Sequence, residues 1–279
     1  MKIVFSEKCL DYSNWHVESP ERVREAWQIL QNEGYKFIKP KPASDDEIFR
    51  VHSKQYVERI RTGNFYDPDT PAYKNIYEYA KLSAGGAVLA AKERGFSLMR
   101  PPGHHAGRNG KALGAQTLGF CYLNNMAIGV KSLGSPTLIL DIDGHHGNGT
   151  QETFYEDPSV TFVSLHRSPH YPGTGLRSEA NCFNFPLFNE VGDDAYLETL
   201  DKALAQVKAR HFEVVGISAG FDAHKGDLAS LGLSSKCFRE IGKRIRALEK
   251  PVFGALEGGY SGKNVGEDLH ELIQGLEEP

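Results

Sequence analysis

Short apolar runs rich in β-branched residues alternate along the chain with longer segments of helical periodicity. This alternation is typical of an α/β fold with an open, mostly parallel sheet. The runs are apolar at successive positions, as expected for strands that helices cover on both faces of the sheet. We predict strands over Lys2–Ser6, Phe96–Met99, Thr137–Leu140, Val160–Leu165, Val214–Ile217 and Val252–Leu256.

The first long helical segment has clear end signals. Ser19 is placed to cap a helix over Pro20–Glu33, Pro20 suits its first position, and Gly34 ends it. Because no linker, repeat or low-complexity tract divides the chain, we expect a single domain over residues 1–279. Further helices are predicted at Asp45–Val51, Ser53–Thr62, Tyr73–Arg94, Asn125–Leu133, Asp194–Ala209, Lys236–Leu248 and Gly262–Leu276.

Composition excludes several classes of protein. The chain has 279 residues, 40% of them hydrophobic, which is ordinary for a soluble globular protein. Its net charge of −4 offers no excess of positive charge for nucleic acid. No apolar run approaches the roughly 20 residues of a membrane span, and Met1–Phe5 is too short for a signal peptide. Four scattered cysteines are typical of reduced thiols, so a cytoplasmic location is expected.

Polar, glycine-rich segments follow five of the six predicted strands. In an open parallel sheet, ligands bind beyond the carboxyl ends of the strands. We therefore expect these segments to meet in one crevice and to form one active site. The segments are Arg100–Ala106, Asp141–Thr150, His166–Gly173, Ser218–His224 and Glu257–Tyr260.

Two of these segments carry metal-ligand chemistry. Asp143 and His145 are two residues apart, so an extended backbone points both side chains the same way. Asp222 is the best-placed third ligand, and such a set leaves positions open for water and a substrate carbonyl. The alternative is that these residues only cap helices and form turns. Gly147 and Asn148 follow where a second ion would need carboxylates, which favours one ion.

His104 and His105 follow a stiff Pro-Pro-Gly turn and could act as general base and electrostatic partner. Each needs an acceptor on its other ring nitrogen, and Asp141 and Asn148 could supply these acceptors. Metal ligation by the pair itself, or two surface histidines, are the alternatives. Tyr260 follows two glycines, so its phenol could reach a substrate oxyanion or could be an ordinary rim tyrosine.

Aromatic residues stand near the same loops, in Gly119–Asn125 and Tyr171–Gly173. Facing aromatic walls would suit a narrow channel around an extended alkyl chain. Core packing is the competing interpretation of the same residues.

Taken together, these segments resemble the histone deacetylase family, within the superfamily of arginase-like amidohydrolases. The motifs that match in the family's order are Arg100–Ala106, Gly119–Asn125, Asp141–Thr150, Ser164–His166, Ser218–His224 and Glu257–Tyr260. Weaker similarity extends from His16–Arg22 almost to the C-terminus, so the resemblance covers nearly the whole chain.

The resemblance implies a single α/β domain that hydrolyses acyl groups from amines, typically the acetyl group of acetyl-lysine, through a metal-activated water. It implies that Asp143, His145 and Asp222 bind the catalytic metal. It also implies that His104 and His105 are the catalytic pair, with His105 the preferred general base. Zinc is the expected metal, with Fe²⁺ or Co²⁺ as alternatives because two carboxylates and one imidazole form an oxygen-rich ligand set.

Other roles follow by motif from the same resemblance. Asp141 and Asn148 would be the acceptors behind the histidine pair, and Tyr260 would polarise the scissile carbonyl. Phe120 and Tyr171 would wall the channel for the acyl-lysine. The remaining matches are the rim aspartate that grips the substrate backbone (Asp69), a carbonyl near the substrate amide (Gly119) and an arginine of the product channel (Arg22).

The family also binds potassium beneath the metal. The matching residues for this structural ion are Asp141, Asp143, His145, Ser164 and Leu165. A second potassium site is expected near Phe154, Asp157 and Val160.

Departures from the family pattern bear on the substrate. Asn148 stands where many eukaryotic members have Asp, and Glu257 fits the branch of bacterial and class II enzymes. Leu228 or Ala229 lies at a pocket wall, and neither is the gatekeeper Glu of polyamine deacetylases. An acetyl-lysine peptide or protein is therefore the expected substrate. Acetylpolyamines or other small N-acyl amines are the alternative, and a non-catalytic acyl-lysine-binding module is a third. Nothing in the sequence indicates the oligomeric state.

Overall fold

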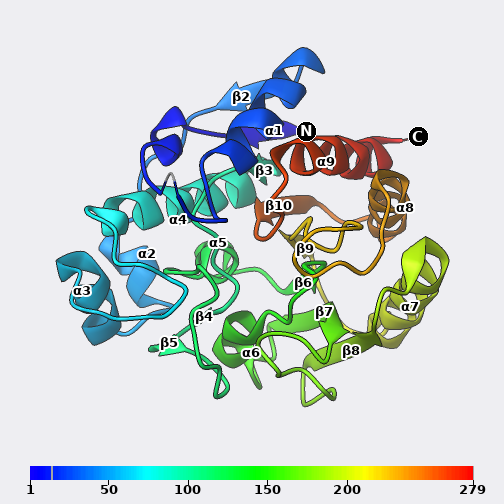
Figure 1. Cartoon of the computed structure of the whole chain (residues 1–279). Helices are drawn as coiled ribbons and strands as arrows, with labels where there is room; N and C mark the ends of the chain where they lie inside the picture. Colours follow the sequence, from blue (N-terminus) through cyan, green and yellow to red (C-terminus); the bar gives the residue numbers. More distant parts are fainter. Residues whose placement is uncertain (14, 279) are drawn as a thin grey trace.

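A computed structural model describes residues 1–13 and 15–278 of the chain. In this part, eight strands form one sheet in the order β2-β1-β3-β10-β9-β6-β7-β8, and each neighbouring pair is parallel. The predicted α/β fold with an open parallel sheet is confirmed (Figure 1). The strands are β1 (Lys2–Val4), β2 (Lys36–Ile38), β3 (Phe96–Ser97), β6 (Thr137–Asp141), β7 (Val160–Ser168), β8 (Cys182–Phe188), β9 (Val214–Ala219) and β10 (Val252–Leu256). A separate two-stranded hairpin joins β4 (Ala106–Gly107) to β5 (Gly110–Lys111).

Helices cover both faces of the sheet, as Figure 1 shows. One group contains α1 (Glu21–Asn32), α7 (Gly192–Val207), α8 (Ser235–Arg246) and α9 (Gly262–Glu277). The other contains α2 (Asp45–Phe49), α3 (Lys54–Thr62), α4 (Ile76–Glu93), α5 (Asn125–Leu133) and α6 (Asn148–Phe154). The short 3-10 helix η1 (Glu7–Leu10) contributes Cys9 and Leu10 to the core of the first group. None of the helices in the described residues is long and apolar enough to cross a membrane.

Strand β6 contributes side chains to the hydrophobic cores on both faces of the sheet. Leu138 and Leu140 belong to the hydrophobic cluster that includes the residues of α8 and α9. Ile139, between them, belongs to the cluster that includes the residues of α4 and α5. Successive side chains of a strand point to opposite faces, so a fully apolar strand fills two cores.

The six predicted strands are present, whereas β2 and β8 were not predicted. Both lie at the edges of the sheet. An edge strand has a neighbour on one side only, so its sequence tolerates polar residues and proline. Lys36 in β2 and Pro186 in β8 are of this kind. The sequence therefore carries a weak strand signal at both edges.

The predicted cap of α1 is wrong in one detail. Pro20, not Ser19, is the N-cap residue, and the cap has no side-chain hydrogen bond. Pro20 has helical dihedral angles (φ −57°, ψ −32°), which agrees with its predicted place in the first turn. Gly34 does follow the helix end, with a φ of +78°.

The five strands that the polar segments follow are consecutive in the sheet: β3, β10, β9, β6 and β7. The register places Asp141 at the end of β6 level with Ser164 of β7 and Ser218 of β9. Five loops therefore lie side by side at the carboxyl ends of these strands.

His52 holds the turn between α2 and α3 against two points of the long connection from β3 to α5. Its Nδ1 donates to the Gly107 carbonyl oxygen at 2.9 Å, and its Nε2 accepts the Asn124 N–H at 2.9 Å. Burial lowers the pKa of His52 from 6.5 to about 4. A proton on Nε2 would displace the Asn124 N–H, so the folded protein keeps this imidazole neutral.

We expect His52 to make the protein sensitive to acid. Between pH 6.5 and 4 the unfolded chain binds this proton more readily than the folded chain. Stability is therefore full above pH 6.5 and falls by about 2–3 kcal/mol on reaching roughly pH 4.5. Urea unfolding near pH 7.5 and near pH 4.5 measures the loss. The His52→Gln variant should lose less stability over this interval, and an equal loss in both proteins would contradict the prediction.

Candidate active site

A pocket of about 400 Å³ opens where the five loops meet. Its walls combine aromatic rings with imidazoles and one carboxylate. Residues from four of the five polar segments are thereby brought together with Asp69, Gly119 and Phe120. The lining residues are Asp69, His105, Gly119, Phe120, His145, His170, Tyr171, Leu228 and Tyr260.

Asp143, His145 and Asp222 form a buried cluster beside this pocket, with one ligand-type atom of each within 4.8 Å of the others. His145 Nδ1 lies 3.1 Å from Asp143 Oδ1 and 2.9 Å from Asp222 Oδ2. Burial opposes a charge on His145, but the carboxylates of Asp222 and Asp143 raise its pKa to about 10. The cluster thus attracts positive charge strongly.

These residues fit a divalent cation. Asp222 Oδ2 is buried, and its near neighbour is His145 Nδ1 at 2.9 Å, a contact without good hydrogen-bond geometry. An ion could therefore take the place of the His145 proton at this oxygen. Two carboxylates and an imidazole are a common ligand set of catalytic divalent metals. A divalent ion would also supply the positive charge that the proton of His145 supplies in its absence.

Backbone amides hold the two carboxylates in place. Gly258 donates to Asp143 Oδ2 at 2.7 Å, and Gly144 donates to Asp222 Oδ1 at 2.8 Å. A Cβ atom at Gly258 would overlap the carboxylate oxygens of Asp222 and Asp143, so this close approach requires glycine. The glycine-rich segments therefore fix the orientation of the ligand atoms.

Each histidine of the adjacent pair has an acceptor on Nδ1. His104 Nδ1 lies 3.0 Å from Asp141 Oδ2, and His105 Nδ1 lies 2.8 Å from Asn148 Oδ1. Asn148 in turn donates from Nδ2 to the Ala112 carbonyl oxygen at 2.9 Å, which fixes the orientation of its amide. His105 must therefore donate from Nδ1, and its Nε2 carries a free lone pair.

The pKa values of the two imidazoles move in opposite directions. Burial, with His104 and His145 nearby, holds the pKa of His105 well below its usual range. Burial also disfavours charge on His104, but the carboxylates of Asp143 and Asp141 raise its pKa to about 10. Neighbouring groups whose pKa values are pushed apart are suited to separate base and acid roles. The pair is thus suited to a division of roles, with a neutral His105 able to accept a proton and His104 able to carry charge.

Tyr260 lies at the pocket with its ring between two partners. The Phe120 ring meets it edge-on at 5.7 Å between centroids, and the Arg22 guanidinium lies 5.0 Å from its centroid. Its backbone N–H donates to Asp227 Oδ2 at 3.0 Å. The turn and the ring are thus both held, and Tyr260 lines the same pocket as His105.

Arg22, expected in a product channel, is fully buried behind this turn. It donates from Nε to the Gly259 carbonyl oxygen at 2.6 Å and from its terminal nitrogen to the Glu257 carbonyl oxygen. Glu18 pairs with Arg22 and also with Arg100. The arginine therefore supports the turn that carries Tyr260; its place in a channel stays a prediction.

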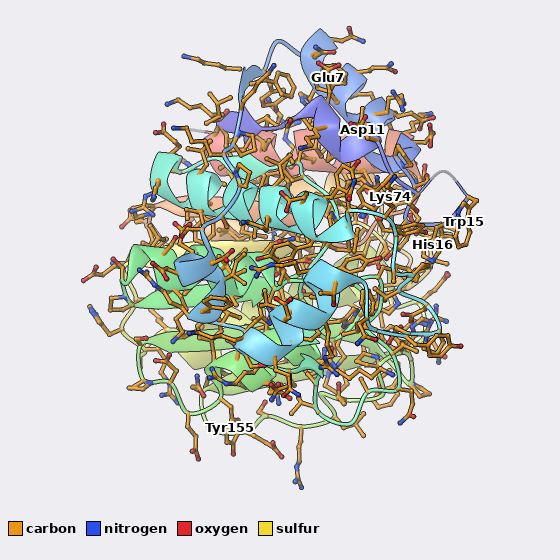
Figure 2. All side chains as sticks on the ribbon, turned by 90° about the vertical axis from the view of Figure 1, so that its left-hand side faces the viewer. Glu7, Asp11, Trp15, His16, Lys74 and Tyr155 are labelled. Carbon is orange, nitrogen blue, oxygen red and sulfur yellow. The ribbon has the colours of Figure 1, made fainter. Side chains whose placement is uncertain are left out.

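The rim residues are also near one another. Asp69 Oδ1 accepts the Gly119 N–H at 3.1 Å, and the Tyr171 hydroxyl donates to the Thr117 carbonyl oxygen at 3.0 Å. His16 packs edge-on against Phe120 at 4.7 Å. Figure 2 shows His16 at the edge of the molecule, consistent with an outer position on the rim.

One pocket residue, His170, was not predicted as part of the site, and Leu228 was predicted only as one of two alternatives. His170 lines the pocket, and its ring lies 5.0 Å from that of His145. It directly precedes Tyr171 in a loop already singled out, which was the available signal. Leu228 rather than Ala229 forms the wall, because Ala229 is buried against Gly144.

The residues expected around a first potassium ion gather at the ends of β6 and β7, where Asp141 pairs with Ser164. Ser164 and Leu165 are both buried. The role of this group in ion binding stays a prediction.

The second expected potassium position does not fit an ion. The carbonyl oxygens of Phe154, Asp157 and Val160 do converge, but on the side-chain amide of Asn181. Asn181 Nδ2 lies 2.8, 3.2 and 2.8 Å from them, and Asn181 Oδ1 accepts the Glu156 N–H at 2.8 Å. A neutral donor from the chain itself thus satisfies the oxygens that a cation would need.

We expect Asn181→Ala to lower the free energy of unfolding by about 1–3 kcal/mol, because buried carbonyl oxygens lose their donor. Urea unfolding measures the change. Asn181→Asp should destabilise more, since it adds acceptors to a group of acceptors. Unchanged stability in both variants would show that the amide does not hold these oxygens.

Comparison with known proteins extends these observations to the whole chain. Residues 16–276 match the family model described as the histone deacetylase domain. A "probable deacetylase" of Archaeoglobus fulgidus is 38% identical, with 93% of this chain and 81% of that protein covered. The "histone deacetylase-like amidohydrolase" of Pseudomonas aeruginosa is 34% identical over 88% of this chain and 73% of its own length.

Solved structures agree with this assignment. The HD domain of HDA15 superposes with a TM-score of 0.89 at 30% identity, covering 98% of this chain and 87% of that chain. An acetylpolyamine aminohydrolase from Burkholderia pseudomallei has the same fold, with a TM-score of 0.89 at 24% identity over 100% and 99% of the two chains. Sequence, fold and the grouping of motif residues in one pocket lead to the same result: the chain belongs to the histone deacetylase family.

Proposed function

We propose that this protein is a zinc-dependent deacetylase that removes the acetyl group from acetyl-lysine-type substrates. One observation carries the proposal. His105, His145 and Tyr260 line a single pocket walled by Phe120 and Tyr171. A base, a metal ligand and a hydrogen-bond donor at one narrow apolar pocket are what hydrolysis of an amide on an alkyl chain requires.

Asp143, His145 and Asp222 would hold one divalent ion, and zinc is the ion that we propose. Fe²⁺ and Co²⁺ also accept such mixed oxygen and nitrogen ligands. When bound, the ion supplies a Lewis acid that polarises the amide carbonyl and lowers the pKa of water. The amide donors Gly258 and Gly144 keep the two carboxylates in their orientation throughout.

The side chains on the pocket side manage protons and charge. His105 accepts the proton of the attacking water at Nε2, because its Nδ1 is committed to Asn148. Tyr260 donates its phenolic hydrogen to the substrate carbonyl oxygen as negative charge develops there. His104 keeps its Nδ1 on Asp141 and stabilises that charge from beside His105. The proton taken by His105 then passes to the leaving amine.

The walls favour an acetylated lysine side chain. Phe120, Tyr171 and Leu228 offer apolar surface to a methylene chain. Leu228 carries no charge that would select a polyamine. Asp69 nevertheless places one carboxylate at the rim, where it can accept a substrate backbone N–H or meet a cationic amine. Acetylpolyamines therefore remain the second candidate substrate.

Acetate release from an acetyl-lysine peptide tests the proposal, using protein stripped of metal and then reloaded with zinc. We expect release only after reloading, and inhibition by a hydroxamate. Acetylspermidine at the same concentration forms the second arm, and a faster rate there would favour the polyamine alternative. Zinc-loaded protein that binds the peptide without releasing acetate would overturn the proposal in favour of a non-catalytic acyl-lysine-binding module.

A further inference from the structure

Glu257 is a fully buried carboxylate that has no part in the chemistry described so far. It lies immediately after β10. Its Oε2 accepts two consecutive backbone N–H groups, those of Gly103 at 2.7 Å and His104 at 3.0 Å. Its Oε1 accepts the Ser218 hydroxyl at 3.2 Å. The carboxylate thus joins the end of β10 to the loop after β3.

Neighbouring residues also hold this loop through its carbonyl oxygens: Ser83 and Asn125 donate to that of Pro101, and the Thr150 N–H donates to that of His104. Pro101 and Pro102 have no N–H to donate, so the amides of Gly103 and His104 are the first that a neighbour can hold. Both go to the same carboxylate oxygen. A shift of this peptide would move His104 and His105 together, since both side chains follow it directly.

The four-residue turn from Glu257 to Tyr260 also contacts the other parts of the site. Gly258 donates to the ligand-type carboxylate of Asp143. Arg22 holds the carbonyl oxygens of Glu257 and Gly259 from behind. One short segment therefore contacts the loop that carries His104 and His105, contacts the metal cluster and carries Tyr260.

We infer that Glu257 is a positioning residue: its carboxylate fixes the peptide that carries His104 and His105 relative to the metal cluster and Tyr260. The inference rests on the proposed deacylase function. Glu257 does not line the pocket, so it acts on the rate of the chemical step and not on substrate binding.

Two conservative variants separate the effect of the length of the Glu257 side chain from the effect of its charge. Glu257→Gln keeps the length of the side chain and an oxygen that can accept both amides, but removes the charge. Glu257→Asp keeps the charge but is one methylene shorter, so it no longer reaches both amides. We expect kcat of the Gln variant to stay within about threefold of the parent protein. We expect kcat of the Asp variant to fall about 10- to 100-fold, the usual effect of a misplaced catalytic group.

KM for the acetyl-lysine peptide and the zinc content should be unchanged in both variants. Ser218→Ala is the matched control, because it removes the Oε1 partner and leaves both amide bonds on Oε2. Its kcat should also stay within about threefold. A Gln variant as slow as the Asp variant, or an Asp variant as fast as the parent, overturns the inference.

A parent protein that is inactive on both acetyl-lysine peptide and acetylspermidine would overturn the proposed function. Hydrogen exchange then tests the role of Glu257 without any turnover. In that case the backbone amides of Gly103 and His104 should exchange hydrogen faster in the Asp variant than in the Gln variant. Equal exchange in the two variants overturns the positioning role independently of catalysis.

Discussion

Tyr260→Phe is expected to lower kcat about 10²- to 10³-fold, which is the usual effect of removing one oxyanion donor. The change deletes only the hydroxyl. The ring contacts with Phe120 and Arg22 do not need that oxygen, so the turn and the pocket should keep their shape. Steady-state kinetics on an acetyl-lysine peptide, with zinc content measured on the same sample, gives the result. The loss should appear in kcat, while KM and zinc content stay near those of the parent.

Tyr155→Phe serves as the control for loss of a tyrosine hydroxyl. Tyr155 is 47% exposed and, in Figure 2, lies far from His16 at the pocket rim. Its variant should match the parent in kcat. Near-normal turnover by Tyr260→Phe would remove this phenol from the mechanism and leave charge stabilisation to His104 and the metal alone.

The site could be anticipated from the sequence because its chemistry is local to strand ends. Asp143 and His145 stand two residues apart directly after β6, and His104 and His105 are adjacent after β3. Parallel strands bring such ends to one edge of a sheet, so the topology needed only the strands to be recognised. The strands concerned are central, mostly apolar and buried on both faces, which gives them the strongest sequence signal.

Interactions between distant residues gave no comparable signal. Glu257 bonds to Gly103 across 154 residues of sequence, and nothing near Glu257 indicates that partner. Asn181 likewise has the sequence context of an ordinary turn residue, although its amide donates to the carbonyl oxygens of Phe154 and Val160. Such bonds depend on side-chain direction in the folded chain, which periodicity and spacing do not determine.

The opposite pKa shifts of His104 and His105 also arise from residues that are distant in the sequence. The two residues are chemically identical and adjacent, so the sequence alone cannot assign their roles. Their surroundings decide: the carboxylates of Asp143 and Asp141 raise the pKa of His104, whereas burial and the nearby His104 and His145 lower the pKa of His105.

Asp222→Asn is expected to abolish activity by preventing metal binding. Asn can still accept the Gly144 N–H at Oδ1, but it replaces the anionic oxygen, Oδ2, with a neutral donor. The loss of zinc affinity should exceed the ~10- to 100-fold that follows loss of an outer-shell partner. Zinc titration of metal-stripped protein measures this loss, and acetate release should fall with it.

The stability of the metal-free protein separates loss of a ligand from loss of the fold. Burial and the nearby Asp143 carboxylate raise the pKa of Asp222. When no cation is bound, the protonated His145 beside them offsets only one of these two negative charges, which destabilises the protein. Metal-free Asp222→Asn should therefore unfold at a urea concentration no lower than the metal-free parent. Asp193→Asn, at a carboxylate that instead holds Ser234, should keep full zinc affinity. A variant Asp222→Asn that binds zinc as tightly as the parent would exclude Asp222 as a ligand and leave the cluster one donor short of a catalytic site.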